Sequence, residues 1–189
     1  MPLLPRLTPA VPLAGLLALL ALAACDQGPA TVTPYRHPTG AFDFLVAATR
    51  DGGPLYLEID GDPFGTGEDL EGRVIAALEP ALQSRVLSLT TDQDAAEDPA
   101  FRLVVVFNPP DSGELMAFCA SQPEGGSPEA EGAAAAGRVE LRAGFCNGDD
   151  LLAAVDGWVE EAQGPGDARF EQLLHQVARD LFARRQADD

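Results

Sequence analysis

Four of the carboxylates between residues 60 and 71 are candidate metal ligands. They are Asp60, Asp62, Glu68 and Glu71, and Gly65 lies between the first and second pairs. Carboxylate oxygens are the hard ligands that Ca²⁺ prefers, and a glycine permits the sharp turn by which a short loop surrounds the ion. This segment is therefore the candidate metal site of the chain.

The same segment resembles the calcium loop of EF-hand proteins. Asp60, Asp62, Gly65 and Glu71 match its first, third, sixth and twelfth positions, but Phe64 replaces the oxygen ligand of the fifth position. A strand, rather than a helix, is expected before it. The alternative is a glycine-rich turn whose acids stabilise the N-terminus of a following helix. We favour this alternative and keep calcium binding as the second hypothesis.

Residues for hydrolytic or zinc chemistry are scarce. The histidines are His37 and His175, and Ser112 and Ser121 do not lie in a Gly-x-Ser-x-Gly motif. The spacing of histidines and cysteines matches no zinc site, and the chain has neither a phosphate-binding loop nor a dinucleotide fingerprint. Because no catalytic set of residues is recognisable, we expect no enzymatic activity. An enzyme of this sequence would need a polar pocket that contains either an acid with a perturbed pKa or His175.

The pair Cys119 and Cys146 could form a disulfide in an oxidising compartment. If segments 113–120 and 138–146 formed a simple hairpin, however, the two residues would lie at opposite ends of it. At about 3.4 Å per residue, roughly 20 Å would separate the sulfurs, which is too far for a bond. The disulfide therefore requires that these segments are not adjacent antiparallel strands.

The first 24 residues have the pattern of a signal peptide, with Arg6 followed by an apolar run at 13–24. The sequence Leu22-Ala23-Ala24-Cys25 resembles the lipobox of bacterial lipoproteins. That resemblance implies cleavage before Cys25 and acylation of this cysteine. Two or three acyl chains attach a protein to a membrane effectively permanently. Asp26 resembles the enteric signal that retains a lipoprotein in the inner membrane, so we expect the domain on the periplasmic face of that membrane.

The chain is strongly acidic. Its formal net charge is −18, with 12 Lys and Arg against 30 Asp and Glu. Because Arg6 leaves with residues 1–24, the mature part carries −19, and all its basic residues are Arg. A polyanion of this kind repels nucleic acid, so nucleic-acid binding is excluded. A basic partner or divalent cations are compatible with the charge.

Alternating or continuous apolar residues predict the strands, and helical spacing predicts two helices. We expect strands at 42–46, 55–59, 86–90, 101–107, 114–119, 139–145 and 151–159, with 101–107 central because it is apolar on both faces. One helix runs from 70 to 82 after a capping box of Thr66 and Asp69, and another follows Asp167. Residues 25–40 are expected as the lipidated cysteine and a flexible tether, and 121–137 as a disordered loop.

These elements predict one α+β domain over residues 41–186, with a mostly antiparallel sheet of about six strands and two amphipathic helices on one face. The mature chain resembles uncharacterised small envelope proteins of proteobacteria, in the segments 61–64, 106–109, 118–119 and 145–146. We therefore expect a non-enzymatic, membrane-anchored periplasmic protein that binds or supports another envelope component. The alternative is a small-ligand or calcium-binding module.

Overall fold

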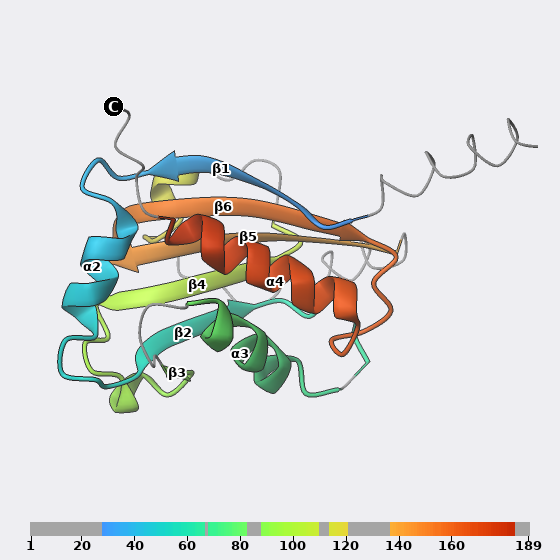
Figure 1. Cartoon of the computed structure of the whole chain (residues 1–189), viewed down its shortest axis with the longest axis horizontal. Helices are drawn as coiled ribbons and strands as arrows, with labels where there is room; N and C mark the ends of the chain where they lie inside the picture. The colour runs from blue at the N-terminus through green and yellow to red at the C-terminus, as the bar shows by residue number, and fades with distance from the viewer. Residues whose placement is uncertain (1–27, 67, 83–87, 110–113, 121–136, 184–189) are drawn as a thin grey trace, which may run out of the picture.

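A computed structural model describes residues 28–66, 68–82, 88–109, 114–120 and 137–183 (Figure 1). The predicted signal peptide 1–24 and Cys25 lie outside these ranges, as do residues 121–136 of the predicted disordered loop. No helix in the described part is long and apolar enough to cross a membrane.

The described elements confirm the α+β class. The strands are β1 (Ala30–Arg36), β2 (Leu55–Asp60), β3 (Leu89–Thr90), β4 (Phe101–Phe107), β5 (Arg138–Asn147) and β6 (Asp150–Glu160). The α-helices are α2 (Ala41–Ala48), α3 (Leu70–Ala81) and α4 (Ala168–Leu181), and short 3₁₀ turns lie at η2 (Gln93–Ala95) and η3 (Leu115–Ala117).

The six strands form one sheet in the order β1-β6-β5-β4-β2-β3. Three pairings are antiparallel (β1 with β6, β6 with β5, and β5 with β4), and β2 pairs in parallel with both β3 and β4. The sheet is thus mostly antiparallel, as predicted, and mixed at one side. The strand β4 is interior, and its residues Leu103, Val104 and Val105 are buried, which confirms its central place.

The helices α3 and α4 cover one face of the sheet (Figure 1). Asp167 caps α4, since its side chain accepts a hydrogen bond from the Arg169 backbone at 2.8 Å. The apolar stripe of α4 packs so closely on β6 that a Cβ added at Gly157 would lie 2.9 Å from Leu173 and 3.0 Å from Val177. A side chain at this position would force Leu173 or Val177 to move, and the close contact positions the helix on the sheet.

The α3 helix begins differently from the prediction. Asp69 is itself the N-cap residue, accepting a hydrogen bond from the Gly72 backbone at 2.9 Å. Thr66 instead accepts a long hydrogen bond from the Glu68 backbone at 3.5 Å, so the predicted capping box is wrong. The predicted strand 86–90 is reduced to Leu89–Thr90, and residues 83–87 lie outside the described part.

Part of the predicted tether is folded. Within the range 25–40, Ala30–Arg36 forms β1, which pairs antiparallel with β6. The last turn of α4 also holds β1, because the Thr31 hydroxyl and the Arg36 guanidinium both donate to Asp180. Pro34 lies at a register shift in this edge strand, the position where a strand tolerates proline. The prediction of a flexible tether to residue 40 is therefore wrong, and the folded part begins ahead of residue 41.

The predicted strand 42–46 is wrong, because this segment belongs to helix α2. Phe42, Phe44 and Val46 alternate over too few residues to distinguish a strand from a helix. The residues that α2 buries are Ala41, Leu45 and Ala48, whose spacing of four and three is helical.

The predicted strand 114–119 is also wrong, since Leu115–Ala117 forms the 3₁₀ turn η3. This segment packs on the sheet face opposite α3 and α4. There Phe118 lies over Gly144 of β5, where an added Cβ would be 2.5 Å from the ring. A second, smaller core forms around it from Val104, Cys119, Cys146, Leu151 and Ala154.

The structure contains the Cys119–Cys146 disulfide, with a Cα–Cα distance of 5.8 Å. The separation of roughly 20 Å expected from the sequence applied only if the two cysteines lay on the paired strands of a hairpin. Because 114–120 lies across the face of the sheet instead of beside β5, Cys119 can lie directly over Cys146. The bond thereby holds η3 against the sheet.

Replacing both cysteines (C119S/C146S) should lower the free energy of unfolding by about 3.5 kcal/mol, the chain-entropy value for a crosslink spanning 27 positions. Urea denaturation followed by circular dichroism measures the loss. A reductant should destabilise the unmodified protein similarly and leave the variant unchanged. Identical unfolding of the unmodified protein with and without reductant would contradict the assignment.

Candidate functional site

The sheet face that α3 and α4 leave uncovered is the candidate interaction surface, and we call it the outer face. Side chains alternate between the faces of a strand, and the register brings together Glu58, Arg102, Arg142, Asp156 and Trp158 on this side. The outer face therefore combines charged and aromatic side chains from β2, β4, β5 and β6.

Each arginine of the outer face lies against a carboxylate. Arg102 is 3.2 Å from Glu58, and Arg142 contacts both oxygens of Asp156, at 2.6 and 3.1 Å. This hydrogen bond raises the pKa of Arg142, although burial opposes the effect. Because these guanidinium groups are already paired across strands, they stabilise the sheet and do not form a free anion site.

Arg102 also connects the outer face to its surroundings. Besides its ion pair with Glu58, its guanidinium donates to the backbone carbonyl of Cys119 and, at 3.0 Å, to that of Gly148. The pKa of the neighbouring Tyr56 is raised, first by partial burial and second by the negative charge of Glu58. The positive charge of Arg102 opposes this rise. One guanidinium thus holds the end of the η3 segment beside the disulfide.

Apolar side chains of β1 and of the η3 segment also lie on this side of the sheet, and we call these residues the outer patch. It comprises Val32, Tyr35, Leu115, Met116 and Phe118, of which Tyr35, Leu115 and Phe118 pack on the smaller core. Val32 and Met116 are each 53% exposed. Among the residues described, only one other large hydrophobic, Val46, is classed as exposed. Exposed apolar groups on an otherwise charged surface are typical of protein interfaces.

Sequence reasoning missed the outer patch. Val32 and Tyr35 fell in the segment predicted as a tether, and Met116 fell in a predicted strand. The one sequence feature that could have predicted a strand at Val32 and Tyr35 was the run Thr31-Val32-Thr33, because β-branched residues favour strands.

The calcium candidates serve other purposes in the structure. The Asp62 carboxylate accepts hydrogen bonds from the Phe64 and Gly65 backbones, at 2.9 and 3.0 Å, and so closes its own turn. Glu71 accepts a hydrogen bond from the Thr91 hydroxyl at 2.7 Å. The Phe64 ring packs edge-on against Phe170 in the core. These contacts are those of a structural turn between strand and helix.

Asp60 is the last residue of β2, and Glu68 is exposed just before α3. Within the described ranges, no group of three or more His, Cys, Asp or Glu side chains is arranged to hold a metal ion. The structure therefore does not gather Asp60, Asp62, Glu68 and Glu71 around one point, and calcium binding stays a prediction.

His175 lines a surface pocket of about 310 Å³ between α3 and α4, together with Pro80, Ala81, Gln172 and Arg179. Its Nε2 atom is buried without a hydrogen-bond partner. Because solvent does not reach Nε2, a molecule in the pocket would not reach it either. The described lining includes no carboxylate and no serine, threonine or cysteine that His175 could activate.

His37 has a structural environment. Its ring nitrogen Nδ1 accepts a hydrogen bond from the Thr39 backbone at 3.2 Å, and its ring packs edge-on against Phe44 of α2. Ser112 and Ser121 lie outside the described residues. Among the described residues, neither histidine is hydrogen-bonded to a hydroxyl or thiol side chain.

Comparison with protein families and with curated proteins finds no match to this chain.

The contacts of Asp62 and Glu71 predict that millimolar calcium leaves the melting temperature equal to that in chelator. Differential scanning fluorimetry measures it. The matched variants D62N and E71Q serve as controls, because each removes one charged ligand of the proposed loop. A calcium-dependent rise in melting temperature that either variant abolishes would instead establish the calcium site.

Proposed function

We propose that this protein is a lipid-anchored, non-enzymatic protein of the periplasmic face of the inner membrane that binds another envelope protein through its outer patch. The lipobox ending at Cys25 and the following Asp26 support the location. The observation that carries the binding role is the exposure of Val32 and Met116 on the sheet face that the helices leave uncovered.

The outer patch suits recognition because its parts are rigidly held. The disulfide at Cys119 and the hydrogen bond from Arg102 hold the chain beside Met116. The pairing of β1 with β6 holds Val32. A preorganised surface loses little conformational entropy on binding, so even a small apolar contact contributes to affinity.

The charge of the chain defines the chemistry of the partner. A mature net charge of −19 without lysine favours a partner with a basic rim around an apolar contact. Complementary charge of this kind accelerates association and disfavours acidic competitors.

Lipidation can be tested by replacing the anchor residue. We expect the mature wild-type protein to begin at Cys25, to carry the mass of two or three acyl chains and to remain with the membrane fraction. The variant C25A should lack this mass and leave the membrane fraction or stay uncleaved. Intact-protein mass spectrometry and fractionation measure both properties. A mature wild-type chain that bears no lipid would contradict the anchor.

The binding surface can be tested with a photoreactive amino acid at Met116. Irradiation of the native envelope should give one cross-linked adduct of defined mass. The yield of this adduct should fall as the salt concentration rises, and the adduct should be lost when the same chain also carries the substitution V32D. The matched control is the same amino acid at Ala76, which is exposed on α3 on the other side of the sheet. The outer patch is not the binding surface if both positions give the same adducts, or if Met116 gives none.

A further inference from the structure

The short connection between the anchor and the fold limits how the domain can lie on a membrane. Four residues, 26–29, separate Cys25 from Ala30, the first residue of β1. A fully extended chain covers at most about 3.6 Å per residue, so Ala30 lies within about 18 Å of Cys25. The end of the sheet where β1 begins is therefore next to the bilayer whenever Cys25 is acylated.

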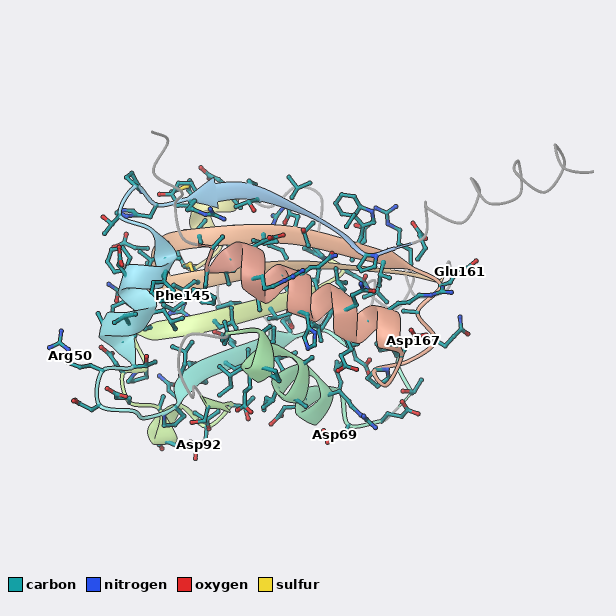
Figure 2. All side chains as sticks on the ribbon, in the orientation of Figure 1. Arg50, Asp69, Asp92, Phe145, Glu161 and Asp167 are labelled. Carbon is teal, nitrogen blue, oxygen red and sulfur yellow. A yellow bond between two sulfur atoms is a disulfide. The ribbon has the colours of Figure 1, made fainter. Side chains whose placement is uncertain are left out.

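The residues at that end are known from the register. Ala30 pairs with Trp158, near the end of β6, and Arg138 begins β5 opposite Glu160. Figure 1 shows the start of β1, the end of β6 and the beginning of α4 at one end of the molecule, with α2 at the other. Figure 2 shows Glu161 at the first end and Arg50 at the second.

The side chains beside Ala30 suit the polar surface of a bilayer. The Arg138 guanidinium lies 5.5 Å from the centre of the Trp158 ring, and it is also paired with Glu140 and Glu160. Tryptophan is enriched at the level of lipid headgroups, where its ring is partly apolar and its N–H remains solvated. Since Arg138 is balanced by carboxylates, this small region fits zwitterionic headgroups, whereas the acidic domain as a whole is repelled by anionic ones.

From these observations we infer that the domain stands on its β1-start end, with Trp158 and Arg138 against zwitterionic lipid headgroups and the β5–β6 turn pointing away from the membrane. This inference rests on the proposed acylation of Cys25. It adds a lipid-contact surface distinct from the outer patch.

The orientation also places the outer patch. Its smaller core includes Leu151 and Ala154, which lie seven and four positions from Trp158 along β6. At about 3.3 Å per residue, the η3 segment on this core stands roughly 13 to 23 Å farther from the lipid than Trp158. The partner must therefore present its contact surface at that height above the bilayer.

The fluorescence of Trp158, the single tryptophan of the chain, tests the orientation. The purified lipidated protein is inserted into phosphatidylcholine vesicles that carry a nitroxide quencher at the headgroup. We expect loss of most of the Trp158 emission. The matched variant W158F/D149W, whose tryptophan lies at the exposed β5–β6 turn, should keep its emission, and circular dichroism checks that it folds.

A second variant tests the short connection directly. A Gly/Ser insertion of about 20 residues before Ala30, with an r.m.s. span on the order of 25 Å, should restore most of the Trp158 emission. The inferred orientation is overturned if Trp158 is not quenched, if the tryptophan of W158F/D149W is quenched equally or more, or if the insertion has no effect.

Mass spectrometry and vesicle flotation distinguish failure of the orientation from failure of the anchor. A protein that carries acyl chains and floats with the vesicles, but whose Trp158 is not quenched, overturns the orientation alone. A protein that carries no acyl chain overturns both the anchor and the inference built on it.

Discussion

The helix α4 packs so closely against β6 that a side chain at position 157 would displace Leu173 or Val177, and much of the structure depends on this contact. Leu173 and Val177 lie directly on Gly157, and the same helix fills the core with Phe170 and Leu181. At its other end, Asp180 accepts hydrogen bonds from Thr31 and Arg36 of β1. One helix therefore both contributes to the core and fixes the edge strand β1.

The two faces of the sheet are stabilised by different physical means. Burial of apolar side chains against α3 and α4 stabilises the inner face, where hydrophobic area is large. The outer face has a much smaller apolar core, and its stability comes from a disulfide and from arginine–carboxylate pairs across neighbouring strands. A face held in this way can leave apolar side chains exposed without losing its shape, which a binding surface requires.

The proposed anchor, Cys25, precedes by a few residues the edge strand β1, which carries Val32 and Tyr35 of the outer patch. With Cys25 acylated as proposed, the domain would not sample a wide volume above the membrane, as it would on a long tether, because β1 starts only a few residues after this cysteine. A partner in the same membrane would then meet the patch at a restricted height and orientation. Such restriction raises the effective concentration of the two surfaces, so weak contacts can be sufficient.

The sequence by itself determined the α+β class, the central strand 101–107, the turn at 147–150, the strands on both sides of that turn and the apolar stripes of the two long helices. These segments are long and strongly periodic, and Asp167 provides a local cap, so neighbouring residues decide their structure. From sequence came also the prediction that Cys25 is a lipidation site, which stays a prediction, and the inference that Cys119 and Cys146 could pair only outside a hairpin. Tertiary structure alone decided β1, α2 and η3, the parallel pairing of β2 with β4, and therefore the outer patch. These segments are short, and a short segment adopts the conformation that buries its few apolar residues against elements distant in the sequence.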